Sequence, residues 1–310
     1  MHDLVSRLDA KPELRLVPYT FQRAYGRPPE GVWTAPYAVR LAGHAVAFAV
    51  QWQVIVAAAP RSDTTLRLAS LNRPAEWLET DVRETAEDVP AWAAGPYDAL
   101  RRAGPPLGAD ILVHADLPAV TGLCADVPLA CATVLAATEV HGAGLARDEL
   151  AHLIASDPVI AAAVLAGRAG HAVGEGTVRL PFDPRSAGLS LLLIVTRAAS
   201  PAPASTSAGA PPPDTGRLIR LLRGGDLAAA ARSLAGHART GSAEATTAID
   251  AACGAGALAA WPHGPAVVAI MPAAARPAVR ASVSAAFGER GPRPPRFLNL
   301  TVAGAARRQA

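Results

Sequence analysis

Three short segments of the chain contain the side chains best suited to chemistry. The residues concerned are Arg40, His44, Gly122, Cys124, Asp126, Trp261 and His263. If folding brings these segments together, an imidazole, a carboxylate and a thiol in one pocket could support acid–base or nucleophilic catalysis. His44, Asp126 and Cys124 are therefore the candidate working groups of a small-molecule enzyme.

The same residues also have purely structural interpretations. His44 fits a surface or hydrogen-bonded histidine, and Cys124 fits a small buried apolar side chain. The run WPHGP at residues 261–265 consists of bulky, stiff residues that would fill space. No two histidines have metal-ligand spacing, and the three cysteines lack a C-x-x-C pattern. The sequence therefore predicts neither a metal site nor a disulfide framework.

The elements that must position these residues follow an α+β order. Predicted strands lie consecutively within residues 31–68 and at 109–115, 189–195, 266–271 and 296–302. Predicted helices cover 91–102, 127–142, 147–166, 217–240, 243–254 and 273–287. Asp126 offers a capping side chain to the 127–142 helix, and Pro128 fits its first turn. In the C-terminal half, the order strand, helices, strand, helix, strand predicts helices stacked on one face of an antiparallel sheet.

Length and composition predict two domains. A chain of 310 residues can bury two cores, and we expect halves at residues 1–185 and 186–310. The stretch SPAPASTSAGAPPPDTG, at residues 200–216, has the composition of a flexible loop.

Charge and hydropathy argue against several kinds of partner. The net charge is +3, but arginines alternate with acids along the chain, so we expect no nucleic-acid binding. Lys11 is the single lysine, which excludes a phosphate-binding loop built on a GK[ST] lysine. The first residues do not form a signal peptide, and no apolar run reaches the ~18 residues of a membrane span. The expectation is a cytoplasmic protein that does not bind membranes.

From about residue 21 to 308, the chain resembles galactokinases in the order of its segments and in their local amino-acid sequence. The first galactokinase motif has the form APGRVNLIGEHTDYN, and residues 35–49 read APYAVRLAGHAVAFA. The phosphate loop has the form VPxGAGLSSSAALE, and residues 117–130 read LPAVTGLCADVPLA. The third motif, GARMTGGGFGGCVIALVP, corresponds to GALAAWPHGPAVVAIMP at residues 256–272. The chain is therefore similar to galactokinases and to the wider GHMP superfamily of small-molecule kinases.

The resemblance implies an α+β, two-domain GHMP-kinase fold. A ribosomal-S5-domain-2-like half would occupy residues 1–185, and a ferredoxin-like half would occupy residues 186–310. The three motifs would then surround one cleft. The implied activity is phosphoryl transfer from ATP with Mg²⁺, which depends on positioning and charge neutralisation.

Many residues that the resemblance would assign to ATP and magnesium are replaced in this chain. Val120 stands where the pattern has a glycine that lets the backbone approach the phosphates. Cys124, Ala125 and Asp126 stand in place of three serines. A carboxylate ~4 Å from a phosphate would repel it by about 1–4 kcal/mol. Ala130 occupies the position of the magnesium-linked glutamate.

The catalytic and sugar-binding positions differ as well. Ile160 aligns with the catalytic aspartate, and Asp157 nearby is either a displaced proton acceptor or a turn residue at a helix end. Where the first motif has Arg, Glu, His and Asp, this chain has Ala38, His44, Ala45 and Ala47. Galactose would lose most of its orienting hydrogen bonds at such a site.

The sequence therefore predicts a pseudokinase on a galactokinase-like scaffold, with the old cleft open to a sugar-like small molecule. No cofactor is assigned; ATP and Mg²⁺ are expected only if activity is retained. Two alternatives stay open. One is a small-molecule enzyme, with residual sugar phosphotransferase activity or with new chemistry in the cleft. The other is a regulatory protein that binds a protein partner.

Overall fold

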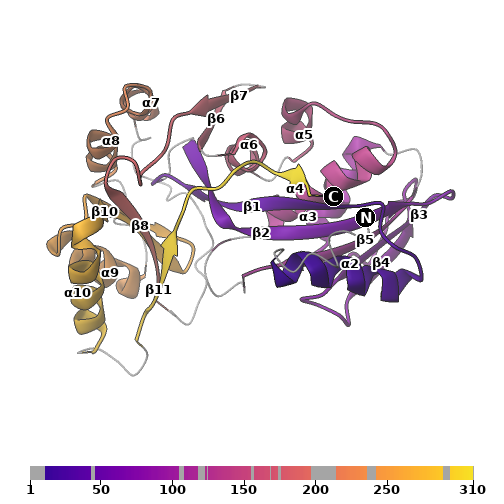
Figure 1. Cartoon of the computed structure of the whole chain (residues 1–310), viewed down its shortest axis with the longest axis horizontal. Helices are drawn as coiled ribbons and strands as arrows, with labels where there is room; N and C mark the ends of the chain where they lie inside the picture. The colour runs from indigo at the N-terminus through magenta and orange to yellow at the C-terminus, as the bar shows by residue number, and fades with distance from the viewer. Residues whose placement is uncertain are drawn as a thin grey trace.

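The computed structural model describes most of the chain in two sheets with attached helices (Figure 1). The described residues are 11–42, 46–104, 108–117, 123, 125–154, 157–167, 169–173, 176–196, 214–235, 242–288 and 294–309. Among these residues, no helix is long and apolar enough to cross a membrane.

The first sheet has eight strands in the order β12-β1-β2-β5-β3-β4, with β6 paired to β2 and β7 paired to β6. Its strands are β1 (Gly31–Arg40), β2 (Val46–Pro60), β3 (Thr65–Ser70), β4 (Trp77–Asp81), β5 (Ala109–Ala115), β6 (Ala169–Val173), β7 (Gly176–Leu180) and β12 (Arg307–Arg308). Strands β3 and β5 run parallel, whereas the other pairs are antiparallel.

Helices cover both faces of the first sheet. Helix α2 (Pro12–Tyr25) buries Val17 and Phe21 against Ile55 of β2 and its neighbours. On the opposite face lie α3 (Ala94–Ala103), α4 (Asp126–Val140), α5 (Arg147–Leu153) and α6 (Pro158–Ala166). Successive residues of β2 point to opposite faces, which places Ile55 under α2 and Val54 in the main core.

The second sheet has four antiparallel strands in the order β11-β8-β10-β9. They are β8 (Leu189–Val195), β9 (Ala259–His263), β10 (Ala266–Pro272) and β11 (Arg296–Leu300). Helices α9 (Ala243–Gly254) and α10 (Arg276–Gly288), the latter preceded by the short 3-10 turn η2 (Ala273–Ala275), pack on one face. The other face joins the main core with α7 (Thr215–Arg223) and α8 (Leu227–Ser233), so one hydrophobic core runs through both sheets.

Two predicted helices are each divided in the structure. The 147–166 helix breaks at Asp157 and Pro158, because proline lacks the N–H of a helical turn and disfavours helical backbone in the residue before it. The 217–240 helix breaks at Gly224 and Gly225. Gly225 has a φ of 76°, a left-handed backbone conformation that glycine adopts easily. Both breaks create a new helix N-terminus capped by an aspartate.

The predicted loop and domain limits are only partly covered by the description. Residues 200–213 of the predicted flexible loop lie outside the described residues, and residues 215–216 already belong to α7. Strand β7 of the first sheet ends at Leu180, and the next strand in the chain, β8, begins the second sheet at Leu189. A boundary between residues 185 and 186 is consistent with this division but stays a prediction. Strand β12 returns to pair with β1 in the first sheet.

Candidate functional site

The structure brings together two of the three sequence motifs. Trp261 lies in β9, and its indole Nε1 donates a hydrogen bond to the backbone oxygen of Arg40 at 3.0 Å. Arg40 ends β1, where the chain turns through Ala42 with a φ of 42°. The first and third motifs are therefore in direct contact, although Arg40 and Trp261 are 221 positions apart in the sequence.

Arg40 also holds Asp157 at the start of α6. The Nη2 of Arg40 donates to both carboxylate oxygens of Asp157 at 2.7 Å, and each side chain is 28% exposed. Asp157 is the N-cap of α6, and its Oδ1 accepts from the backbone N–H of Val159 at 3.1 Å and of Ile160 at 3.0 Å. The interpretation of Asp157 as a residue at a helix end is confirmed.

Ile160, at the position that the resemblance gives to the catalytic aspartate, lies in the first turns of α6. Its side chain is half-buried and packs against the main hydrophobic core. An aliphatic side chain there can neither accept a proton nor orient a hydroxyl group. Asp157, one turn earlier, has both oxygens engaged by Arg40 and by the helix backbone. These bonds leave it poorly placed to accept a substrate proton.

His263, the last residue of β9, completes this cluster. Burial lowers its pKa to about 4; the positive charge of Arg40 adds to this shift, and the negative charge of Asp157 opposes it. The imidazole is therefore neutral at pH 7 and can act as a hydrogen-bonding group. We call Arg40, Asp157, Trp261 and His263 the interface cluster, because it joins the first sheet, α6 and the second sheet.

The depressed pKa of His263 predicts a pH-dependent stability. Between about pH 6.5 and pH 4, His263 binds a proton in the unfolded chain but not in the folded chain, so protonation favours unfolding. The stability that comes from keeping this imidazole neutral is complete above pH 6.5 and is lost as the pH falls to 4. From pH 7 to pH 5, we expect the wild type to lose about 1–2 kcal/mol more unfolding free energy than His263→Gln. Urea denaturation of both proteins at the two pH values measures the difference. An equal loss in both would contradict the assignment.

The remaining predicted site residues are not part of this cluster in the described structure. Asp126 is exposed in the first turn of α4, and the N-cap of that helix is Ala125, with no side-chain cap. The prediction that Asp126 caps the helix is therefore wrong by one position. His44, Gly122 and Cys124 lie outside the described residues, so their proximity to Asp126 stays a prediction.

Among the described residues, the other titratable groups give no second candidate for nucleophilic or metal chemistry. Cys131 is buried in α4, and burial raises the pKa of its thiol far above the ordinary value, which keeps it protonated. Cys253 is exposed on α9. Within the described part of the chain, no three His, Cys, Asp or Glu side chains are grouped to hold a metal ion.

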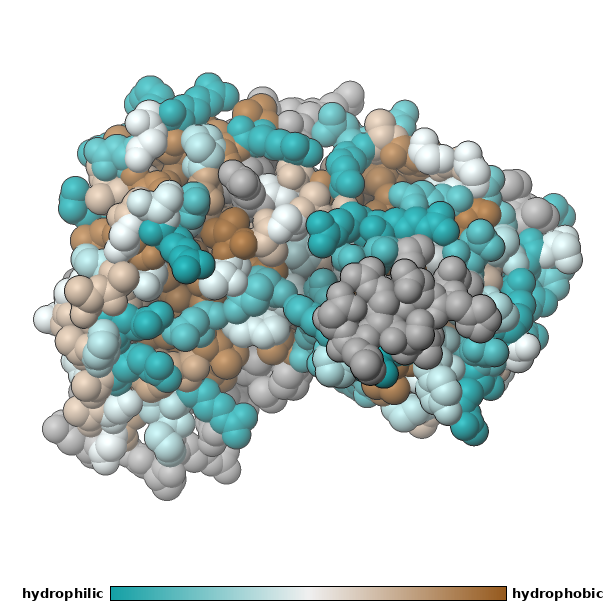
Figure 2. Space-filling model, viewed as in Figure 1, coloured by the Kyte–Doolittle hydropathy of each residue, from teal (hydrophilic) through white to brown (hydrophobic). Residues whose placement is uncertain are grey.

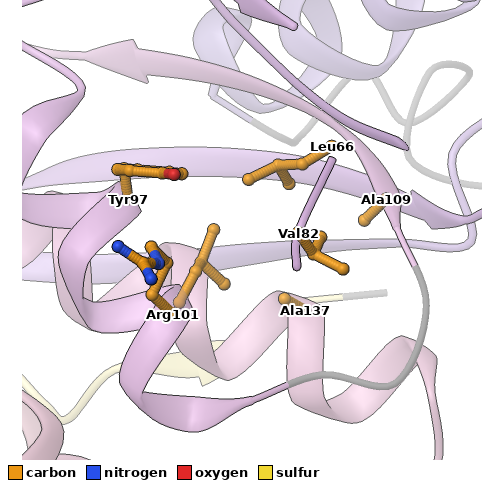
Figure 3. Close-up of a pocket in the computed structure, with 7 residues that line it drawn as sticks. Leu66, Val82, Tyr97, Arg101, Ala109 and Ala137 are labelled. Carbon is orange, nitrogen blue, oxygen red and sulfur yellow. The ribbon is translucent and has the colours of Figure 1, made fainter. Parts of the chain in front are cut away.

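Two cavities lie away from the interface cluster. Figure 3 shows one between α3, α4 and the first sheet, where Leu66, Val82, Tyr97, Arg101, Ala109 and Ala137 surround a space of about 10 Å³. That volume holds about one water molecule, so it is a packing gap and not a sugar or nucleotide site. The other, of about 240 Å³, lies at the C-terminal end of α6, between Arg147 and Arg179. Arg147 is engaged there by the backbone oxygens of Leu165 and Ala306.

Comparison with known proteins agrees with the fold. The structure of Lactococcus lactis galactokinase in complex with galactose matches 96% of this chain and all of its own, with a TM-score of 0.79 at 15% identity. Homoserine kinase from Cytophaga hutchinsonii matches 90% of this chain and 96% of its own, with a TM-score of 0.63 at 15% identity. The Methanococcus jannaschii mevalonate kinase matches 87% of this chain and 98% of its own, with a TM-score of 0.58 at 11% identity.

At the sequence level, the chain is 32% identical to the galactokinase of Streptomyces coelicolor over 205 residues, which are 57% of this chain and 53% of that protein. The chain therefore matches about half the length of this curated relative. No family model matches the sequence.

The two sheets and their helices form an α+β fold like that of the galactokinase, homoserine kinase and mevalonate kinase structures, which belong to the GHMP kinases. Over the 205 matched residues, the chain is similar in sequence to a galactokinase.

The sequence alone had not indicated that Arg40 and Asp157 form a pair. They are 117 positions apart, so no local pattern links them. The available signals were an arginine at the end of a buried strand and an aspartate before proline at a helix start, each of which needs a partner.

Proposed function

We propose that the chain is a galactokinase-like pseudokinase that does not transfer phosphate from ATP to a sugar. The observation that carries this proposal is the start of α6. The resemblance puts Ile160 at the position of the catalytic aspartate, and the neighbouring carboxylate of Asp157 is bonded to Arg40 and to two backbone N–H groups. The galactokinase resemblance implies a carboxylate at this position that would accept the proton of the substrate hydroxyl.

The third motif supports the same proposal. The resemblance puts a glycine-rich segment where this chain has Trp261, and the indole is 1% exposed and bonded to the backbone of Arg40. A buried indole fixed between two sheets occupies volume that a flexible glycine segment would leave to a ligand. The replacements at Val120, Asp126 and Ala130 act in the same direction at the loop that would hold the phosphates.

We further propose that the cleft keeps a sugar-like small molecule as its ligand. The Lactococcus lactis galactokinase, whose fold matches this chain, was solved with galactose. In this chain Ala38 and Ala47 replace polar groups of the first motif, so the ligand of this chain would differ from galactose itself. Arg40 and the neutral imidazole of His263, both in the interface cluster, are the polar groups that we propose for recognition of this ligand.

The proposal is tested by ADP release with ATP, Mg²⁺ and a panel of sugars, with an active galactokinase as the positive control. We expect no sugar-dependent ADP release from this chain under conditions in which the control turns over.

A further inference from the structure

One segment of the chain that is rich in arginine leads into and includes α7. Residues 197–243 contain six arginines and two aspartates, a net charge of +4 against +3 for the whole chain. The rest of the chain therefore sums to −1. Such an asymmetry marks a region that attracts anionic partners.

The structure arranges three of these arginines along one helix. Arg217, Arg220 and Arg223 are all exposed on α7, at successive spacings of three residues, while Leu218 and Leu222 are buried on its other side. A rise of 1.5 Å per residue places neighbouring members about 4.5 Å apart along the helix axis. We call these three residues the arginine stripe.

The two aspartates near the stripe accept hydrogen bonds from backbone N–H groups. The Oδ1 of Asp214 accepts the N–H of Arg217 at 2.8 Å, and the Oδ1 of Asp226 accepts the N–H of Ala229 at 2.8 Å. Each aspartate is an N-cap, of α7 and of α8. Among the described residues, no ion pair within 4.0 Å joins a guanidinium of the stripe to a carboxylate. Residues 197–213, which precede α7, contain no acid at all.

The stripe lies on an accessible corner of the molecule. Helix α7 packs beside β7 at the upper left of Figure 1, and hydrophilic residues gather over this corner in Figure 2. The exposed Arg179 of β7 adds a further positive charge on the adjoining element. Exposed guanidinium groups without acidic neighbours keep their full capacity for bidentate bonds to carboxylates.

We propose that the arginine stripe is a docking surface for an acidic segment of a partner protein. Glutamates repeated every three or four residues on a helix would match the spacing of the stripe. Nucleic-acid binders that depend on phosphate contacts commonly neutralise about 6–10 phosphates, more than a nine-residue helix with three arginines offers. This proposal goes beyond the pseudokinase function and does not depend on it.

The test uses the full chain and a fluorescent peptide with glutamate at every third and fourth position, followed by fluorescence anisotropy at low salt. We expect the peptide to bind, and the variant R217Q/R220Q/R223Q to bind it about ten-fold more weakly, since three exposed ion pairs are lost. A matched control, R83Q/R185Q/R296Q, removes the same charge from exposed arginines elsewhere and should bind like the wild type. Thermal melts of both variants check that they are folded.

Three results would overturn the proposal. The first is no binding of the glutamate peptide to the wild type. The second is an equal loss of affinity in the stripe variant and in the control, which would indicate a general charge effect. The third is tighter binding of single-stranded DNA of the same net charge than of the peptide, which would make the stripe a nucleic-acid surface. A peptide with glutamine in place of glutamate should not bind.

Discussion

Replacing Trp261 by alanine should lower the free energy of unfolding by about 3–5 kcal/mol. The indole is 1% exposed and belongs to the main core shared by the two sheets. Its removal would lose the apolar contacts of the ring and leave a cavity that the paired strands β9 and β10 cannot easily close. Urea denaturation at pH 7, followed by far-ultraviolet circular dichroism, measures the change.

A second variant separates the ring from its hydrogen bond. Trp261→Phe keeps a smaller aromatic ring and removes the N–H that bonds to the backbone oxygen of Arg40, so the lost hydrogen bond should cost about 1 kcal/mol beyond the cost of the lost volume. If Trp261→Ala were as stable as the wild type, the indole would not be a structural part of the interface between the two sheets. The third motif would then have to be interpreted as a flexible segment.

Replacing Asp110 by asparagine should lower the free energy of unfolding by about 3 kcal/mol. This carboxylate, whose side chain is 3% exposed, pairs with Arg27 at 2.6 Å and with Arg61 at 3.1 Å. It links the segment after α2 and the end of β2 to β5. The variant would leave the guanidinium groups of Arg27 and Arg61 without the buried carboxylate that both of them contact. Removing one partner of a buried ion pair is strongly destabilising because the remaining charge loses its counter-charge.

Asp63 provides the matched control for this prediction. It also pairs with Arg61, at 2.6 Å, but its side chain is 50% exposed. Asp63→Asn should therefore change the urea midpoint far less than Asp110→Asn, because an exposed pair is screened by water. Equal midpoints for the two variants would contradict the structural role given to Asp110.

Several elements could be predicted from sequence to the residue. The ranges of β5, β8 and α9 agree with those expected, because each is a continuous pattern with clear limits. In β8, the run LSLLLIV is bounded by Gly188 and by polar Thr196. In α9, the side chain of Ser242 caps the first turn by accepting the N–H of Ala245 at 3.2 Å.

Other elements could not be predicted because local signals conflicted. Helix α2 contains Pro12 and Pro18, and a proline inside a helix argues against one. The packing of Val17 and Phe21 on the sheet outweighs that local cost. The parallel pairing of β3 with β5 depends on the path of the chain through space, which no local pattern specifies.

The candidate site shows the same limit more strongly. The residue types were visible in sequence: Arg40, Trp261 and His263 were candidates, and Asp157 was considered beside them. Their contacts were not visible, because the Arg40–Asp157 pair spans 117 positions and the Trp261–Arg40 bond spans 221. The structure turned a set of suspected side chains into one cluster in which the carboxylate is already bonded.

The most direct test of the pseudokinase proposal measures sugar phosphate itself. The purified chain is incubated with ATP, Mg²⁺ and each sugar of a panel, and ADP and phosphorylated sugar are both measured, beside an active galactokinase under the same conditions. Because the resemblance puts Ile160 at the position of the catalytic aspartate, and the neighbouring Asp157 is bonded to Arg40, we expect neither product above the sugar-free blank. Formation of a phosphorylated sugar together with an equal amount of ADP would contradict the account.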